Sequence, residues 1–169
     1  MGTGGGEHLA RIAAENPTTR FVGCEVFSGG IAKLVEAIDD SELENVRLFT
    51  DDALKLLVTL PDASLDAAYL LYPDPWPKTR HHKRRFISAT TLGELARVLK
   101  PGATFRFATD IEDYANWTLA HVLRAPSFRF AAEPGSWHMP YPGWQPTRYE
   151  QKARREGRDV SFYFSFLRR

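Results

Sequence analysis

Short apolar runs alternate with segments of helical spacing along most of the chain, and this alternation limits the folds that the chain can adopt. Strand-like runs occupy 21–27, 46–50, 65–72 and 104–110, and apolar residues three or four positions apart follow them. The run at 65–72 is nearly all apolar, as expected for a central parallel strand that is covered on both faces. Acidic residues stand at three successive strand ends. The sequence therefore predicts an α/β fold with a doubly wound, mostly parallel sheet, whose ligands bind beyond the carboxyl ends of the strands.

The length and composition are those of one ordinary globular domain covering residues 1–169. Hydrophobic residues make up 43% of the chain and charged residues 25%. No apolar run approaches the roughly 20 residues that a membrane-spanning helix needs, and no signal peptide is recognisable. We therefore expect no membrane association and a cytoplasmic location. The single cysteine, Cys24, sits in a strand-like run and is expected to be a buried structural thiol.

A proline-rich segment with a strongly basic end, residues 72–85, includes the end of the third predicted strand. Because Asp74 and Trp76 each precede a proline, the sequence predicts extended backbone at both. Five Lys or Arg residues and two His residues then fall within 78–85. The formal net charge of the chain is +1, and without those five cations it would be −4. Such a local cluster is typical of a surface that binds nucleic acid, although a basic run can also be an ordinary solvated loop.

A second basic cluster lies near the carboxyl end of the chain and could meet the first one in space. Its members are Arg148, Lys152, Arg154, Arg155, Arg158, Arg168 and Arg169. Just before this cluster, the segment from Pro134 to Pro146 is rich in proline, glycine and aromatic side chains. This segment is too irregular for a helix or strand. It could close over an active site as a lid, or it could meet a partner.

Three features of the first third of the chain are compatible with nucleotide binding, and each has a plainer alternative. The glycine-rich residues 2–6 precede a helix-like segment, which allows close backbone approach and offers free N–H groups, unless this start is simply flexible. Glu25, near the end of a strand, could accept hydrogen bonds from both hydroxyls of a ribose or pair with an arginine. Asp52 could contact a nucleotide or only cap the helix that follows it.

Six motifs taken together resemble the bacterial tRNA (guanine-N7)-methyltransferase family, within the class I S-adenosylmethionine-dependent methyltransferases. They are Gly-Gly-Gly-Glu-His at 4–8, Gly-Cys-Glu-Val at 23–26, Asp-Asp-Ala at 51–53, the proline-rich and basic segment 72–85, Ala-Thr-Asp at 108–110 and Thr-Arg-Tyr-Glu-Gln at 147–151. The segment 72–85 is very specific, whereas a glycine loop and single acids occur in many methyltransferases. The resemblance implies an enzyme that transfers a methyl group from S-adenosylmethionine to a guanosine in the variable loop of tRNA.

The resemblance also implies a role for each residue that matches a family motif. The cofactor-binding residues would be Glu7 at the methionine end, Glu25 at the ribose, Asp52 at the adenine side, and Asp74. The substrate-binding residues would be Lys78, Asp110, Thr147, Arg148, Tyr149 and Glu150. The RNA-contacting residues would be Thr79, Arg80, His81, His82, Lys83, Arg84 and Arg85.

This reaction needs no general base, because N7 of guanine already carries an in-plane lone pair and no proton. It needs alignment of the donor sulfur, the methyl group and the acceptor nitrogen. Asp74 is the candidate catalytic residue: together with Asp110 it could accept hydrogen bonds from the ring N–H and the amino group of guanine, a donor pair that adenine lacks. A strand-end acid paired with Lys78 is the alternative for Asp74. No His or Cys spacing matches a metal site, so no metal is expected.

The chain departs from the family at its start, because Met1 stands where the family's first strand should end. The sequence therefore predicts a methyltransferase domain that is amino-terminally truncated relative to the family and lacks its first strand. Two alternatives follow. The chain could be a non-catalytic, RNA-binding remnant, or a small-molecule methyltransferase on the same fold, against which the basic segment argues. The sequence does not distinguish a monomer from a homodimer.

Overall fold

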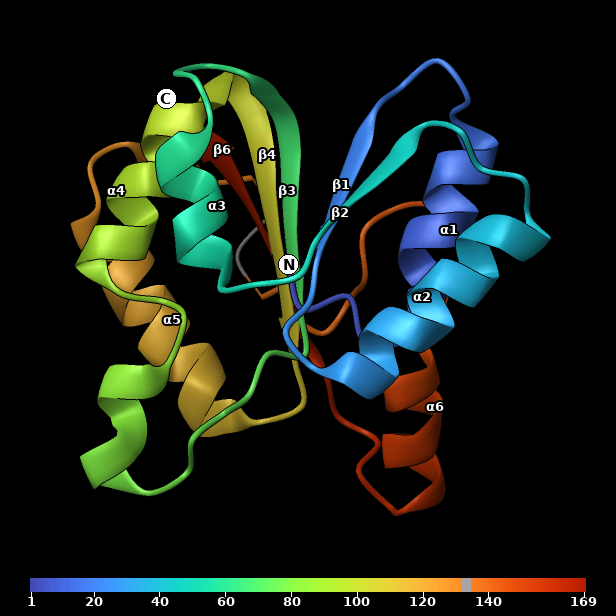
Figure 1. Cartoon of the computed structure of the whole chain (residues 1–169). Coiled ribbons are helices and arrows are strands. Elements are labelled where there is room, and N and C mark those ends of the chain that lie inside the picture. The colour runs from blue at the N-terminus through green and yellow to red at the C-terminus, as the bar shows by residue number, and fades with distance from the viewer. Residues whose placement is uncertain (132–134) are drawn as a thin grey trace. The chain divides into compact units, whose positions relative to one another are not determined.

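Helices and strands alternate along the chain, as the sequence predicts, and Figure 1 shows their order. The computed structural model describes residues 1–131 and 135–169. The chain divides into two units, the first from Met1 to Thr59 and the second from Leu60 to Arg169. Within the described ranges, no helix is both long enough and apolar enough to cross a lipid bilayer.

The first unit contains three helices and two strands among its residues. They are α1 (Glu7–Glu15), β1 (Phe21–Cys24), α2 (Ser28–Asp40), β2 (Val46–Phe49) and α3 (Ala53–Thr59). The two strands are parallel, with Phe21 opposite Val46 and Cys24 opposite Phe49. This pairing brings the carboxyl ends of both strands to the same edge of the small sheet.

The core of the first unit lies between its helices and strands. α1 contributes Leu9 and Ala13, which are four positions apart and therefore share one face of the helix. Leu34 of α2 and Val46 of β2 complete this buried cluster. Cys24, at the end of β1, is 2% exposed, which confirms the predicted buried thiol. Burial also raises the pKa of this thiol.

The second unit contains a sheet with the strand order β3-β4-β6-β5. Its elements are β3 (Leu65–Leu71), the 3-10 helix η1 (Thr79–Arg84), α4 (Ala89–Val98), β4 (Leu99–Thr109), α5 (Glu112–Arg124), β5 (Phe128–Phe130), α6 (Arg148–Arg155) and β6 (Phe162–Arg168). β3 and β4 are parallel, whereas β6 is antiparallel to both β4 and β5. The predicted α/β class is confirmed.

One face of this sheet carries an aromatic core. Phe107 of β4 lies opposite Phe164 of β6, and their rings are stacked with centroids 6.0 Å apart. Phe105 is paired with Phe166 in the same way. Tyr114 of α5 meets the ring of Phe107 edge-on at 5.4 Å. α5 therefore covers this face, and its contact fixes the helix against the two central strands.

Alternate residues of the same strands face the opposite side of the sheet. There the guanidinium of Arg106 lies 3.8 Å from the ring centroid of Tyr141, and the ring of Tyr163 lies 5.3 Å from that of Trp144. Tyr141 and Trp144 belong to the segment that the sequence left open as a lid or a partner contact. In its described part, this segment packs against the sheet. Pro134, where the predicted segment begins, lies outside the described residues.

The start of β4 differs from the prediction. The sequence predicted a strand from residue 104, but β4 begins at Leu99 and includes Pro101 and Gly102. Gly102 has a φ of 80°, a left-handed conformation that glycine adopts without a steric penalty. The pairing with β3 shifts register between Leu65 and Ala67. The strand is thus longer than its periodicity indicates, because a glycine at an irregular point lets the pairing continue past the proline.

Replacing Phe107 by alanine should lower the free energy of unfolding of the second unit by about 3–5 kcal/mol, because it leaves a cavity between α5 and the sheet. Urea denaturation followed by circular dichroism measures this loss. Leu123→Ala on α5 is the control: Leu123 is 79% exposed, so its change should stay within about 0.5 kcal/mol. Equal stability of the two variants would contradict the assignment of Phe107 to the core.

Candidate functional site

In the first unit, Glu25 ties the glycine-rich start of the chain to the end of β1. Its Oε2 accepts a hydrogen bond from the N–H of Gly4 (2.7 Å), and its Oε1 accepts from the N–H groups of Val26 (2.8 Å) and Phe27 (2.9 Å). The partners of this acid are therefore backbone groups, and not the arginine considered from the sequence. Oε2 accepts one hydrogen bond within the described residues, so it keeps acceptor capacity for a ligand hydroxyl.

Close packing requires a glycine at Gly6 of this segment and at Gly30 of α2, which packs against it. Gly6, which precedes α1, has a φ of 81°, and a Cβ atom there would lie 2.2 Å from the side chain of Leu34. A Cβ atom on Gly30 of α2 would lie 2.9 Å from the carbonyl oxygen of Gly4. These contacts argue against a merely flexible start. Glu7 is the first residue of α1 and is exposed, so it stands directly beside this packed glycine segment.

Asp52 follows β2 and caps α3. Its Oδ1 accepts a hydrogen bond from the N–H of Leu54 (2.7 Å), which confirms the capping interpretation. Its other carboxylate oxygen has no hydrogen bond within the described residues, and the residue is exposed. Capping therefore leaves one acceptor oxygen open to a ligand. In the first unit, Glu25 and Asp52 thus place acceptor oxygens, which match hydroxyl and amino donors, just after β1 and β2.

In the second unit, Asp74 lies on a segment with two left-handed residues. Tyr72 has a φ of 49° and Trp76 a φ of 43°, a region that costs a residue with a side chain about 1–3 kcal/mol. The prediction of extended backbone at Trp76 is therefore wrong. A following proline disfavours the right-handed helical region, and Trp76 lies in the left-handed region instead of the extended one. Its ring lies 4.9 Å from the guanidinium of Arg84. Asp74 itself is exposed, and within the described residues it forms no ion pair with Lys78.

Arg85, which the sequence predicted to contact RNA, does not lie on the exposed basic surface. The residue is 3% exposed, and its guanidinium is paired with Asp113 of α5. This hydrogen bond lowers the pKa of the Asp113 carboxyl group. His82 also points inward: its Nε2 lies 3.7 Å from the same carboxylate and its ring 5.4 Å from that of Trp117. Both side chains are held against α5 and are turned away from solvent.

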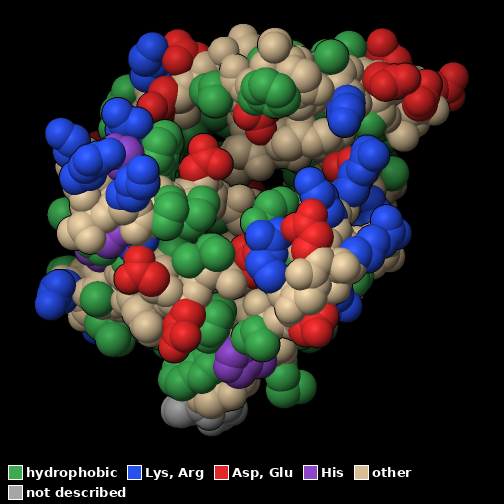
Figure 2. All heavy atoms as spheres, turned by 90° about the horizontal axis from the view of Figure 1, so that it is seen from below, with side chains coloured by type: hydrophobic (Ala, Val, Ile, Leu, Met, Phe, Trp, Pro, Cys, Tyr) green, Lys and Arg blue, Asp and Glu red, His purple; other side chains and the backbone are tan. Residues whose placement is uncertain are grey.

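The other cations of the basic segment are exposed, and none has an acidic partner within the described residues. They are Lys78, Arg80, Lys83 and Arg84. Thr79 is exposed beside them, and His81 is half-buried, with its Nε2 3.3 Å from Nε of Arg80. Figure 2 shows Lys, Arg and His side chains gathered at the left of the view, over η1. This surface, formed by 78–81 and 83–84, keeps its full positive charge for a polyanion.

The second basic cluster differs, because neighbouring acids neutralise part of it. Arg154 pairs with Glu150 at 2.5 Å, and Lys152 lies 3.8 Å from Glu156. Arg158 also pairs with Glu156, at 2.9 Å. These three cations of the second cluster therefore offer less free charge to a nucleic acid than the surface over η1.

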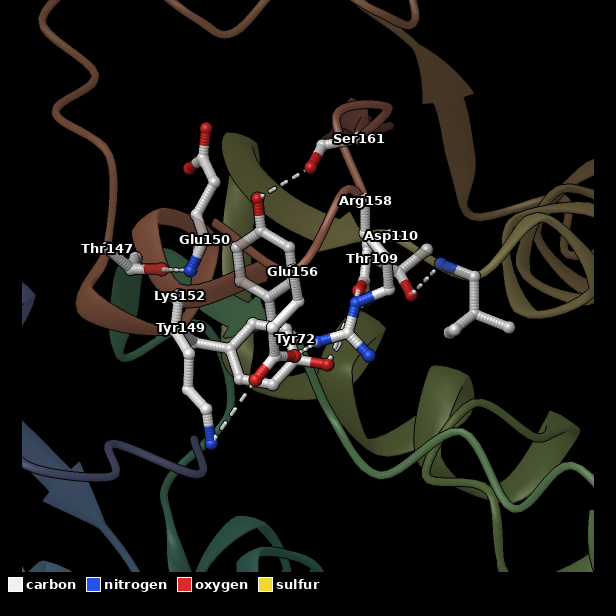
Figure 3. A network of polar contacts seen from close by, with 11 residues as sticks. Tyr72, Thr109, Asp110, Thr147, Tyr149, Glu150, Lys152, Glu156, Arg158 and Ser161 are labelled. Atoms are coloured by element: carbon white, nitrogen blue, oxygen red, sulfur yellow. Dashed lines mark hydrogen bonds and ion pairs between the residues drawn. The ribbon is translucent and has the colours of Figure 1, made fainter. Parts of the chain in front are cut away.

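Asp110 stands directly after β4, as predicted, and its side chain is 3% exposed. Figure 3 shows Tyr149 and Arg158 pointing toward it. The hydroxyl of Tyr149 lies 3.4 Å from each carboxylate oxygen, and Nε of Arg158 lies 3.4 Å from Oδ2. Burial, together with the charge of Asp110, raises the pKa of Tyr149. Because these contacts are long for bonds to a charged group, a ligand N–H could replace them.

Glu150 was expected to bind substrate, but its carboxylate is enclosed by the protein. The residue is 1% exposed. Its Oε1 accepts from the hydroxyl of Tyr163 (2.7 Å) and from Arg154 (2.5 Å), and its Oε2 accepts from the indole N–H of Trp144 (3.1 Å). Its backbone N–H donates to Thr147, which caps α6. Glu150 therefore joins α6, β6 and the aromatic segment. Arg148, beside it, is exposed.

Several members of this network were not identified from the sequence. The hydroxyl of Tyr72 donates to Oγ of Ser161 (3.1 Å), and burial raises the pKa of Tyr72. The ring of Tyr72 lies 5.0 Å from that of Tyr149. Arg158 belonged to a recognised basic cluster, but no local pattern indicated that it would meet Asp110. Among the residues that the structure describes, no group of three or more His, Cys, Asp or Glu side chains could hold a metal ion.

Comparison with known proteins places the chain among methyltransferases. A family model described as "Putative methyltransferase" matches residues 1–163. A curated tRNA (guanine-N(7)-)-methyltransferase of Agrobacterium fabrum is 52% identical over 170 residues, covering 100% of this chain and 73% of its own length. One of the same name from Mesorhizobium japonicum is 54% identical over 170 residues, covering 100% of this chain and 72% of its own length.

Solved structures with low sequence identity share the fold. The 16S rRNA methyltransferase KamB superimposes with a TM-score of 0.68 at 17% identity, covering 100% of this chain and 86% of its own. A SAM-dependent methyltransferase from Aquifex aeolicus gives a TM-score of 0.63 at 16% identity, covering 99% of this chain and 79% of its own. At such identities the likeness supports the α/β architecture alone.

Replacing Glu150 by glutamine should lower the free energy of unfolding by about 1–3 kcal/mol, because a buried amide N–H₂ would face the donors of Tyr163 and Trp144. Glu156→Gln, which changes a more exposed acid beside the same helix, should change it by at most about 0.5 kcal/mol. Urea denaturation of both variants measures the difference. If Glu150→Gln kept the parent stability but lost tRNA affinity, Glu150 would be a substrate contact and its enclosed role would be refuted.

Proposed function

Because the chain belongs to the tRNA (guanine-N(7)-)-methyltransferase family, we propose that it transfers a methyl group from S-adenosylmethionine to N7 of a guanosine in tRNA. The observation that carries this proposal is identity of 52–54% with curated members over the whole chain. The acceptor is a guanosine of the variable loop, as the resemblance in sequence implied. The family model covers both units, and this extent supports a single methyltransferase domain. With tRNA as its substrate, the protein acts in the cytoplasm as a monomer or a homodimer.

The first unit supplies acceptors for the cofactor. Bound S-adenosylmethionine supplies an electrophilic methyl group on a sulfonium. Glu25, just after β1, accepts hydrogen bonds from ribose hydroxyls through Oε2, which can take a further donor. Asp52 accepts from the adenine side through the carboxylate oxygen that does not cap α3. Glu7 stands at the start of α1, beside the glycine segment, where it would bind the methionine end. Asp74 of the second unit is the fourth cofactor residue in this proposal.

The second unit supplies acceptors for the guanine. Asp74 is exposed and unpaired within the described residues, so its carboxylate is free to accept from the ring N–H and the amino group of the base. Asp110, held by long contacts to Tyr149 and Arg158, accepts from the same edge or orients the substrate. No proton leaves N7 during transfer, so orientation of the base and the methyl group is what these residues contribute.

The surface over η1 binds the phosphates of the tRNA. Lys78, Arg80, Lys83 and Arg84 have no acidic partner within the described residues, and Thr79 and His81 border them. Each phosphate that such a cation neutralises releases counterions, so tRNA affinity should fall steeply as salt is raised. Arg148 and Thr147, at the start of α6, complete the proposed substrate positions.

The proposal is tested by incubating the chain with unmodified tRNA transcripts and labelled S-adenosylmethionine. The product is mapped by chemical cleavage at 7-methylguanosine. We expect one methylated guanosine, located in the variable loop. Salt-dependent tRNA binding without methyl transfer would instead support the RNA-binding remnant. Methylation of a small molecule, with no salt-dependent affinity for tRNA, would support the remaining alternative.

Replacing Asp74 by alanine should lower the methylation rate at saturating substrates by about a hundredfold or more, because the base loses its orienting acceptor. The dissociation constant for tRNA should change less than about twofold, since this acid contributes no phosphate contact. Asp66→Ala is the matched control: Asp66 is an exposed acid of β3 that pairs with Lys100. Full turnover in Asp74→Ala would refute the role of Asp74.

A further inference from the structure

Arg85 is a buried cation directly after η1. Its side chain is fully buried, unlike the exposed Arg84 that precedes it. An arginine is almost never fully buried without a partner, because removing its charge from water is costly. Membership of a basic run therefore does not explain why the side chain of Arg85 is buried.

The contacts of Arg85 join two separate segments of the second unit. Its Nε donates a hydrogen bond to the carbonyl oxygen of Pro75 (2.9 Å), and its Nη2 pairs with Asp113 in the first turn of α5. The guanidinium also lies 5.0 Å from the ring centroid of Tyr114 and 5.1 Å from that of Trp117. Arg85 thus fastens the segment after β3 to the face of α5 through a planar cation.

Pro75 is the residue next to Asp74, and the segment has few other ways to be held. Prolines at 73, 75 and 77 have no N–H, so they cannot donate backbone hydrogen bonds. The residues on either side, Tyr72 and Trp76, are both left-handed, a conformation that persists where surrounding contacts enforce it. At Tyr72 the backbone N–H donates to the carbonyl oxygen of Ala108 (2.7 Å). Nearer the middle of the segment, the hydrogen bond from Arg85 holds the Pro75 carbonyl.

We propose that Arg85 is a positioning residue: by holding the Pro75 carbonyl against α5, it sets the direction in which the Asp74 carboxylate meets the guanine. This inference rests on the proposed function of Asp74. Lysine cannot replace Arg85, because an ammonium group is a point charge. It lacks the planar fork that reaches a carbonyl and a carboxylate while lying against two rings.

The test compares Arg85→Lys with the parent in single-turnover methylation and tRNA binding. We expect the rate at saturating tRNA and cofactor to fall between about tenfold and a hundredfold, while the tRNA dissociation constant and its salt dependence stay unchanged. Arg84→Ala serves as the contrast, because loss of a phosphate contact should weaken tRNA binding and flatten its salt dependence. A rate defect without a binding defect distinguishes positioning from RNA contact.

Arg97→Lys is the matched control. Like Arg85, Arg97 combines acid pairing with a hydrogen bond to a backbone carbonyl: it pairs with Asp62 and Glu94 and donates to the carbonyl of Leu60. It lies on α4 and touches no part of segment 72–77 in these interactions. The single-turnover methylation rate of Arg97→Lys should therefore equal that of the parent. An equal rate loss in Arg97→Lys and Arg85→Lys would mean general destabilisation, and would overturn the proposal.

Hydrogen exchange gives a readout that does not require activity. In Arg85→Lys, amides of the peptide 72–84 should exchange faster than in the parent, while those of β6 stay protected. If β6 also loses protection in Arg85→Lys, the variant Asp113→Asn is measured instead. Asp113→Asn removes the carboxylate on α5 that pairs with Arg85 and leaves Arg85 itself in place. Amide exchange in the peptide 72–84 should again be faster than in the parent. An inactive parent would refute the proposed function alone, and the exchange data would still decide the role of Arg85.

Two further results would overturn the inference. In the first, Arg85→Lys methylates at the parent rate and exchanges like the parent over 72–84. In the second, it keeps the parent rate at saturation but loses tRNA affinity and salt dependence as Arg84→Ala does. The second result would make Arg85 an RNA contact, as its sequence position indicated.

Discussion

The pairing of β4 with β6 is the constraint on which the second unit depends. Because these strands are antiparallel, the end of β4 and the start of β6 meet at one edge of the sheet, with Thr109 opposite Phe162. The stacked phenylalanines between them and the contact with α5 hold this register. β3 runs parallel to β4 and ends at the same edge. Backbone pairing therefore brings Asp110, Ser161 and Tyr72 to this edge, where the hydroxyl of Tyr72 also donates to Ser161.

Polar contacts at this edge then fix the loops that leave the sheet. Glu150 gathers donors from α6, β6 and the aromatic segment, and so positions Tyr149 beside Asp110. Arg85 connects the segment after β3 to α5. Both are buried charges whose loss would leave partners unsatisfied. We propose that they hold in place the exposed groups that would meet the substrate.

The alternation of strand and helix patterns was sufficient to predict the α/β class and the places of Asp74 and Asp110 after their strands. It could not predict which charges are buried. Arg84 and Arg85 are equivalent in a basic run, and they differ because Asp113 and Trp117, far along the chain, enclose one of them. The same holds for Glu150, which is enclosed by Tyr163 and Trp144. The left-handed backbone at Trp76 was likewise not predicted, because the rule for residues before proline considers local sterics alone.

We propose that the Asp74 carboxylate orients guanine through its donor pair, and a change of the acceptor base tests this role. The rate of methylation is compared for tRNA with guanosine or inosine at the acceptor position, in the parent and in Asp74→Asn. Inosine keeps N7 and the ring N–H but lacks the amino donor. We expect the parent to discriminate against inosine by about tenfold or more and Asp74→Asn to lose this discrimination, since each unpaired donor or acceptor costs about 1–3 kcal/mol. Equal rates for the two tRNAs in the parent would contradict it.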